Sequence, residues 1–116
     1  MEQFKKIEEA IGYSFENPIL LSEALTHSSY SHEGRRNLKD NERLEFLGDS
    51  VLSLIVAEYL FSHYRHQPEG DLTKLRASLV CEKSLFKFAN EIGLGDFILL
   101  GKGEENTGGR TRPSVV

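Results

Sequence analysis

The sequence predicts an all-α domain, and three observations on its 116 residues lead to that class. Apolar residues recur at helical spacing in one segment after another, and no segment shows the strict alternation of a half-buried strand. Turn-forming residues such as Asn17-Pro18, Gln67-Pro68 and Gly93 separate these segments. Hydrophobic residues make up 39% of the chain, so we expect one compact unit with a modest core and no internal repeat.

Two short helices are predicted at the N-terminus. Apolar positions from Phe4 to Ile11 form one helical face, and Gly12 is expected to end that helix. Asn17 then has the residue type of an N-cap and Pro18 that of a first helical position, which predicts a second helix reaching Leu25. The polar cluster over residues 26–32, with Gly34 and Asn37 beyond it, predicts a loop.

A long third helix is predicted from about Glu42 to His63, with Asn41 as its cap. Strong helix formers dominate this stretch, and Gly48 is its one glycine. The expected core stripe consists of Leu44, Leu47, Val51, Leu54 and Ile55. Beyond Asp49 the helix is apolar nearly all round, which predicts a central, buried helix whose acidic first turns emerge at a cleft.

The remaining segments are shorter. Apolar spacing predicts a fourth helix from Leu72 to Val80 and a fifth over 84–92, closed by Gly93. Residues 97–100 fit either a strand or a helical turn. Residues 101–112 hold four glycines among charged residues and predict an exposed flexible loop, and residues 113–116 resemble the beginning of a further element.

A row of acids is the main chemical signal. Glu42, Glu45 and Asp49 follow one another at spacings of three and four, so they share one sector of a helix. Glu45 and Asp49 lie one turn apart and could both direct oxygens at a hard cation such as Mg²⁺. The plainer alternative is a solvated acidic surface at a helix N-terminus, where the macrodipole favours negative charge, with Arg43 or Lys74 as a partner.

Composition narrows the function classes. A net charge of −4 and a pI near 5.6 do not favour nucleic-acid binding by bulk charge alone. Cys81 is the one cysteine, so the chain can form no intrachain disulfide, which fits a reducing cytoplasm. Cys81 itself is predicted to be a small core residue. His27 and His32 are interpreted as hydrogen-bonding loop residues. No long apolar run predicts a membrane span, so the chain is expected to be soluble, and no glycine pattern predicts a nucleotide-binding loop.

Residues 41–50 read Asn-Glu-Arg-Leu-Glu-Phe-Leu-Gly-Asp-Ser, and this run resembles the signature of the ribonuclease III family. The motif is long and specific. Supporting matches lie at residues 25–30, 69–72, 75–80, 99–104 and 108–109, so the resemblance covers nearly the whole chain. The bacterial members are the nearest comparison.

This resemblance implies an all-helical endonuclease domain that works as a homodimer. Members of the family cut double-stranded RNA with Mg²⁺, or Mn²⁺ as a substitute, in the processing of rRNA and other RNAs. By the resemblance Glu45 and Asp49 are catalytic, metal-binding acids. It also implies that Glu42 and Glu69 are acids near the cleft and interface, that Glu104 is a further acid linked to the site, and that Phe46 inserts into the partner subunit. Phe46 also lies off the predicted core stripe, and on the pattern alone it fits either an exposed contact for a partner subunit or a satellite contact of the core.

The resemblance also implies a departure. In the family, the segment after a pair such as Ser114-Val115 continues into a helix with an Asp and a Glu that complete the metal site, and a double-stranded-RNA-binding domain commonly follows. We therefore expect residues 1–116 to be an endonuclease domain truncated at its C-terminus, with weak or no activity. The alternative is a non-catalytic dimerisation or ribonucleoprotein-assembly module, although a scaffold has no need of clustered acids that repel one another.

Overall fold

The structure is a computed structural model that describes residues 2–32 and 39–116. It confirms the all-α class, because those residues form helices and no strand. The α-helices are α1 (Glu2–Ile11), α2 (Pro18–Ala24), α3 (Ser28–His32), α4 (Glu42–His63), α5 (Glu69–Val80), α6 (Glu82–Glu91) and α7 (Lys102–Asn106), and the 3₁₀ helices are η1 (Leu94–Phe97) and η2 (Gly109–Thr111).

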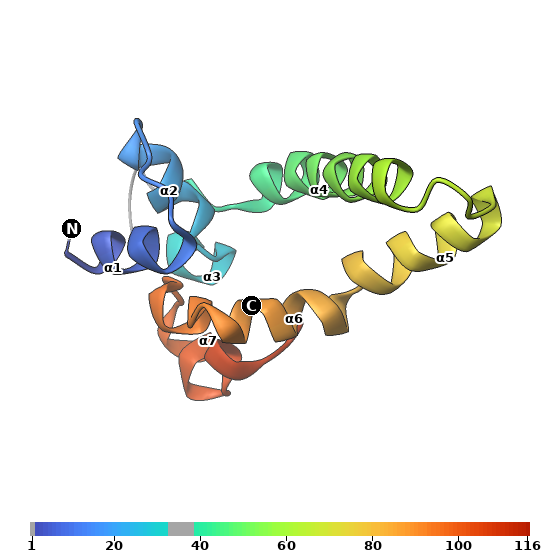
Figure 1. Ribbon diagram of the computed structural model, residues 1–116. Coiled ribbons are helices and arrows are strands. Elements are labelled where there is room, and N and C mark those ends of the chain that lie inside the picture. Colours follow the sequence, from blue (N-terminus) through green and yellow to red (C-terminus); the bar gives the residue numbers. More distant parts are fainter. Residues whose placement is uncertain (1, 33–38) are drawn as a thin grey trace.

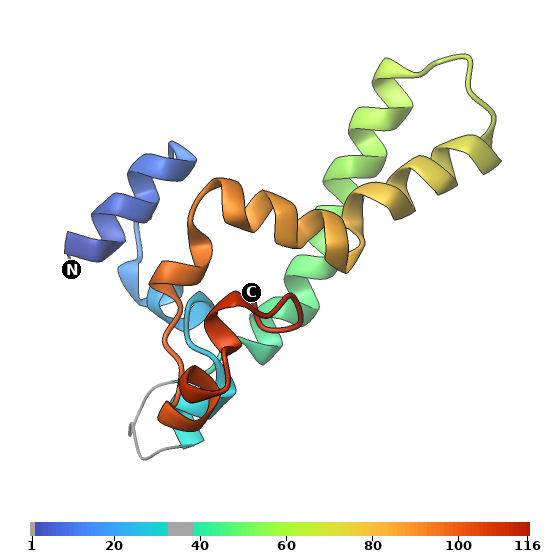
Figure 2. The same ribbon diagram turned by 90° about the horizontal axis from the view of Figure 1, so that it is seen from below.

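The helices form a small folded body with a long arm. Helices α1, α2, α3 and α7 gather at one end, and α4 and α5 run out from it as a hairpin before α6 leads back (Figure 1; Figure 2). The molecule measures 52 × 31 × 24 Å, and its Cα radius of gyration is 16.1 Å. A compact domain of 100 residues has a radius of about 13 Å. The expectation of a compact unit is therefore wrong, because the arm projects from the body.

The core lies at the body end of the molecule. Ile7 of α1, Leu21 of α2 and Leu25 form its buried centre. Phe4, Phe15, Leu94 and Phe97 pack against them. The two N-terminal helices are thus held by η1, which comes from the last quarter of the sequence.

The local signals for the short helices are confirmed. Gly12 follows α1 with φ +71°, and Gly93 follows α6 with φ +69°, a left-handed backbone that glycine adopts without steric cost. The side chain of Asn17 accepts a hydrogen bond from the N–H of Ile19 at 3.1 Å and caps α2. These ends are set by residues next to one another in the chain, which is why the sequence predicts them.

Helix α4 has the predicted bounds and begins after the predicted N-cap residue, Asn41. Asn41 makes no side-chain cap bond. Asp40 Oδ1 instead accepts from the N–H of Glu42 at 3.1 Å. The side chain of Asn41 donates across to the carbonyl of Ala24 at 3.0 Å, so it ties the start of α4 to α2.

The predicted core stripe of α4 faces outward. Leu47, Leu54 and Ile55 have exposed fractions of 59%, 70% and 59%, while Leu60 is the buried residue of this helix. Helix α5 packs along α4, and Leu60 lies in the crevice between them, which the exposed Leu54 also borders. The prediction of a central, buried helix is wrong. Its acidic first turns do border pockets, as expected.

Part of the predicted polar loop is helical. Residues 28–32 form α3, and the N–H of Ser29 donates to Nδ1 of His27 at 3.1 Å. His27 therefore stabilises the first turn, a hydrogen-bonding role as predicted. Gly34 and Asn37 lie outside the described residues. Residues 97–100, which fit either a strand or a helical turn by sequence, contain the end of a helical turn followed by extended backbone. The 3₁₀ helix η1 ends at Phe97, and Leu99 pairs with Thr26 in one parallel bridge.

The prediction of a flexible loop over 101–112 is wrong. This segment folds into α7 and η2, and two ion pairs join them: Glu104 with Arg112, and Glu105 with Arg110. Gly109 is buried there. Gly109 packs closely against Glu104, and the paired charges neutralise one another. Residues 113–115 then form a turn.

Candidate metal-binding carboxylates

The first two turns of α4 bring three predicted site residues to one pocket. Glu42, Glu45 and Asp49 are all exposed, and they line a pocket of about 710 Å³ together with Ser50. Spacings of three and four place side chains on one side of a helix, as the sequence predicts. Glu42 and Glu45 lie in the first turn, where unpaired N–H groups favour negative charge, and Asp49 follows in the second turn. The arrangement presents carboxylate oxygens to solvent.

Local contacts fix the position of this row. The N–H of Glu45 donates to the carbonyl of Asn41 at 2.7 Å, and Asp40 caps the N–H of Glu42. The N–H of Asn41 donates to the carbonyl of Thr26 at 2.9 Å, and Thr26 is fully buried. The carboxylate row is thereby attached to the body of the fold.

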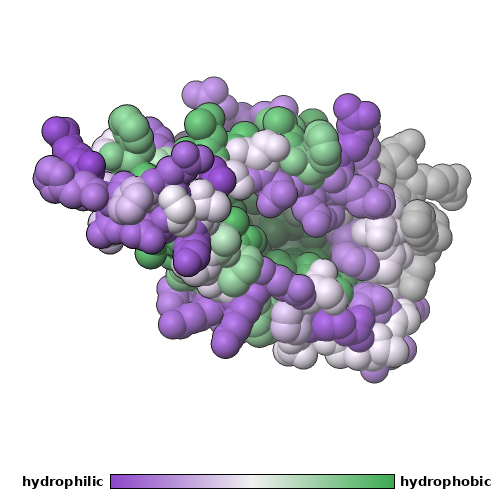
Figure 3. All heavy atoms as spheres, turned by 90° about the vertical axis from the view of Figure 1, so that its right-hand side faces the viewer, coloured by the Kyte–Doolittle hydropathy of each residue, from purple (hydrophilic) through white to green (hydrophobic). Residues whose placement is uncertain are grey.

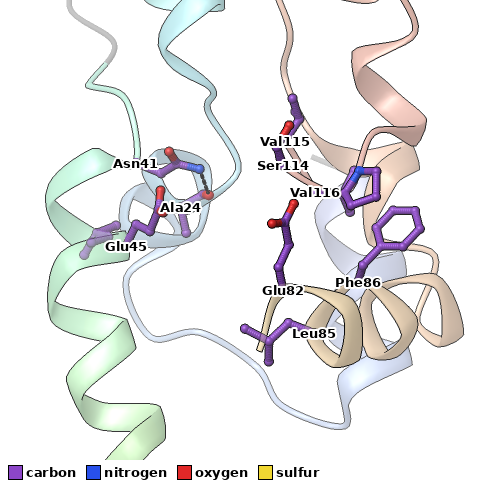
Figure 4. Close-up of a pocket in the computed structure, with 11 residues that line it drawn as sticks. Ala24, Asn41, Glu45, Glu82, Leu85, Phe86, Ser114, Val115 and Val116 are labelled. Atoms are coloured by element: carbon purple, nitrogen blue, oxygen red, sulfur yellow. Dashed lines mark hydrogen bonds between the residues drawn. The ribbon is translucent and has the colours of Figure 1, made fainter. Parts of the chain in front are cut away.

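A second pocket, of about 570 Å³, joins Glu45 to a residue that the sequence did not single out. Figure 4 shows Glu45 of α4 and Glu82 of α6 on opposite sides of this pocket, with Val115 and Val116 from the C-terminal turn above them. Glu82 begins α6, next to the bend at Cys81 that joins α5 to α6. It lies 37 positions from Glu45, so no local spacing in the sequence relates the two acids.

The surroundings of these pockets are apolar. Figure 3 shows a hollow with hydrophobic side chains in its depth and polar ones around its rim. Leu44, Leu85 and Phe86 line the pocket that holds Glu45 and Glu82.

Glu69 and Glu104 border neither of these pockets. Glu69 opens α5 and lines a crevice with Leu60 and Arg76 at the far end of α4. Glu104 lies in α7 and pairs with Arg112. Their roles near the cleft, the interface and the site stay predictions.

Phe46 is exposed, which decides between the two alternatives that its spacing left open. Its exposed fraction is 81%, the highest among the large hydrophobic residues that the structure describes as exposed. It borders the carboxylate pocket and also a neighbouring pocket of about 890 Å³ on the other side, next to Arg43 and Leu47. An exposed aromatic ring beside a cavity is a feature of protein contact sites.

Cys81 is exposed between α5 and α6, so its prediction as a core residue is wrong. Its thiol contacts Ser84 Oγ at 3.4 Å, and this hydrogen bond is the main cause that lowers the pKa of the thiol. Burial would act in the opposite direction. The prediction fails because Cys81 lies at a junction where the helices change direction.

The donor set fits a metal ion in part. In residues 2–32 and 39–116 no group of three or more His, Cys, Asp or Glu side chains is placed to hold one ion. Glu45 and Asp49 offer two carboxylates, and Mg²⁺ is commonly held by one or two carboxylates, with water and substrate phosphates completing its shell. The two acids therefore suit an Mg²⁺ site that is incomplete without further oxygen donors.

The structure is an all-helical domain that exposes carboxylates on one long helix. Comparison with known proteins identifies the family to which this domain belongs. Residues 17–116 match the ribonuclease-III-like family, and the chain belongs to it. The nuclease domain of ribonuclease III from Campylobacter jejuni superposes with a TM-score of 0.88 at 50% identity, covering 99% of this chain and 75% of that one. Another structure of that domain, described by flexibility in a region involved in dimer formation, gives a TM-score of 0.86 at 52% identity, covering 95% and 73%.

Curated relatives agree with this family. Ribonuclease 3 of Geobacillus kaustophilus is 58% identical over 98% of this chain and 47% of its own length. Ribonuclease 3 of Listeria innocua is 53% identical over 100% of this chain and 51% of its own length. The chain thus spans about half the length of these relatives. None of the helices described is both long and apolar enough to cross a membrane.

Proposed function

We propose that residues 1–116 form part of the nuclease domain of an endoribonuclease that hydrolyses phosphodiester bonds in double-stranded RNA. The observation that carries the proposal is the placement of Glu45 and Asp49, one helical turn apart, on an exposed pocket of α4. Membership of the ribonuclease-III-like family supports it, as does the 50% identity to the Campylobacter jejuni nuclease domain.

The proposed cofactor is Mg²⁺, with Mn²⁺ as a substitute, held by Glu45 and Asp49. A bound divalent ion supplies Lewis-acid chemistry: it stabilises negative charge on phosphate oxygens and makes a water more acidic. The chain's own contribution is position. The Asp40 cap and the Asn41 contacts fix the first turn of α4, so the two carboxylates need little reorganisation to receive a cation.

The proposed substrate is recognised by shape. Double-stranded RNA offers phosphates and 2′-hydroxyls in a wide, shallow minor groove, and its bases are hard to reach. A chain of net charge −4 cannot attract such a polyanion through bulk charge, so divalent ions and basic surface on other parts of the protein would have to supply that attraction. We place this activity in the cytoplasm, in the processing of rRNA and mRNA.

The proposed assembly is a homodimer in which Phe46 contacts the partner subunit. Phe46 is exposed beside two pockets, and the exposed Leu47 lines one of them with it. Contiguous apolar surface of this kind marks contact sites in soluble proteins. The same face favours a second candidate function, a non-catalytic module for dimerisation or ribonucleoprotein assembly. The two candidates differ in whether Glu45 and Asp49 are needed.

A cleavage assay separates them. The purified chain in excess over a long double-stranded RNA, with Mg²⁺, should cut slowly, because two carboxylates supply only part of a metal shell. Asp49→Asn should abolish the cutting, since an amide gives up the charge that holds the ion. Asp71→Asn, at an exposed acid in the first turn of α5, is the matched control and should cut like the parent chain.

Fast cutting by the parent chain would show that no further acids are required. Cutting that survives Asp49→Asn would remove Asp49 from the site. If the parent chain binds a second copy and never cuts RNA under any divalent ion, the assembly module is the better description.

A further inference from the structure

Residues 113–116 form a wall of the pocket that Glu45 borders, and the preceding Arg112 secures that wall. The backbone carbonyl of Arg112 accepts from the N–H groups of Val115 and Val116 at 3.0 and 3.1 Å, which closes the C-terminal turn. Both valines line the pocket opposite Glu45 (Figure 4). The position of Arg112 therefore sets the position of the wall.

The side chain of Arg112 is held by α7. Its Nη1 donates to Oε1 of Glu104, and its Nη2 donates to the carbonyl of Thr107 at 2.7 Å. Arg112 and Glu104 have side-chain exposed fractions of 39% and 23%, so the pair is shielded in part from water. A guanidinium that donates to a carboxylate and to a carbonyl together is held in one orientation.

The platform under this pair is itself fixed. Arg110 donates to both carboxylate oxygens of Glu105, at 2.7 and 2.5 Å, and to the carbonyls of Gly95 and Ile98, each at 2.8 Å. Arg110 thereby connects α7 to η1, which packs against the core. A Cβ atom at Gly109 would lie 2.6 Å from Cγ of Glu104, so glycine is what lets Glu104 pack at this place.

We infer that Glu104 and Arg112 are positioning residues for the candidate metal site. Their ion pair holds the turn of residues 112–116 and thereby keeps the wall of the pocket in place opposite Glu45. Glu104 acts on the site through Arg112 and does not bind the metal itself, because its carboxylate is already engaged. The structural part of this inference stands on its own, and its link to metal binding rests on the proposed function.

The distance from the wall to α4 tests the structural part. Nitroxide labels at Ser114→Cys and Ser50→Cys, in a Cys81→Ser background, report that distance by pulsed electron resonance. Both serines are exposed, and neither makes a contact that the inference uses. We expect a single narrow distribution in the parent chain. Arg112→Gln and Glu104→Gln should each broaden the distance distribution. Arg112→Lys, which keeps the charge, should leave most of the population in the narrow distribution.

Arg76→Gln is the matched control, because Arg76 is an exposed arginine of α5 on the hairpin arm. It should leave the distribution narrow. Each variant is measured well below its own midpoint of thermal unfolding, and Glu104→Gln decides the matter if Arg112→Gln does not fold. A narrow distribution in both Gln variants would overturn the inference.

The link to the metal site is read from Mn²⁺ binding by the unlabelled chains. We expect Arg112→Gln to weaken Mn²⁺ binding and Arg112→Lys to restore it. If Arg112→Gln broadens the distance distribution but binds Mn²⁺ as tightly as the parent chain, the position of the wall does not affect the metal site. If the parent chain binds no Mn²⁺ at Glu45, the proposed function fails, while the distance measurement still decides whether Arg112 positions the wall.

Discussion

Asp40 Oδ1 accepts a hydrogen bond of 3.1 Å from the N–H of Glu42, and with this bond α4 begins. The candidate site depends on that start, because Glu45 and Asp49 follow in the next two turns. A frayed first turn would let both carboxylates move. The cap therefore connects the stability of the helix end to the geometry of the site.

Replacing Asp40 with Ala should lower the free energy of unfolding by about 1 kcal/mol, because it removes the cap from an N–H group that has no partner within the helix. Asp40→Asn keeps a side-chain oxygen and should cost less. Urea unfolding followed by circular dichroism measures both. Equal stability of Asp40→Ala and the parent chain would show that the cap contributes nothing.

Gly109→Ala should destabilise the segment of α7 and η2. The added Cβ would lie 2.6 Å from Cγ and 2.8 Å from the carbonyl oxygen of Glu104, so backbone must shift, at a cost of about 1–3 kcal/mol. Gly103→Ala is the matched control. A Cβ there meets nothing within 4 Å, and Gly103 lies in a helix, where Ala is the better residue. Thermal unfolding that ranks the two variants the other way would contradict this packing.

Leu60 and Phe46 lie on the same helix, but replacing each with Ala should affect a different property: folding stability for Leu60 and self-association for Phe46. Leu60 has an exposed fraction of 3%, so Leu60→Ala should cost about 2–5 kcal/mol of stability. Phe46→Ala should change the stability of the isolated chain by less than about 0.5 kcal/mol. It should instead weaken self-association in sedimentation. Association that is unchanged in Phe46→Ala would remove Phe46 from the subunit contact.

Acid should weaken the fold through Glu105. Arg110 donates hydrogen bonds to Glu105 and lowers the pKa of its carboxyl below the ordinary value of 4.5. Folding therefore favours the ionised form, and the stability from this pair is full above that pH and is lost as the pH falls through the lower folded value. Glu105→Gln should unfold at a lower temperature than the parent chain at neutral pH, and the difference should close in acid.

Glu9→Gln, at an exposed residue of α1 outside the two ion pairs of α7 and η2, is the control for that comparison. Its unfolding temperature should follow that of the parent chain throughout the acid range. A difference between Glu105→Gln and the parent chain that persists unchanged below the folded pKa would mean that ionisation of Glu105 is not its cause.

Local chemistry made much of the fold predictable. Asn17, Gly12 and Gly93 act on backbone groups within a few residues, and the bounds of α4 follow from an unbroken run of helix formers. The row of Glu42, Glu45 and Asp49 is predictable for the same reason, because one helix carries all three.

Features that depend on distant segments were not predictable. The side of α4 that packs inward is chosen by α5, so the periodicity of Leu47 and Leu54 could not tell core from contact surface. Glu82 joins the pocket of Glu45 only after the chain has reversed between α4 and α5 and run back toward the body (Figure 1). The glycines of 101–112 suggest flexibility until the pairs of Arg110 and Arg112 are seen.

The central claim is that Glu45 and Asp49 together hold a divalent ion, and Mn²⁺ binding measured by electron paramagnetic resonance tests it directly. The account predicts one weak site per chain, whose affinity falls by at least about tenfold in Asp49→Asn and in Glu45→Gln, because each removes one of the two ligands. Asp71→Asn should bind Mn²⁺ like the parent chain. Equal affinity in the parent chain, Asp49→Asn and Glu45→Gln would contradict the account.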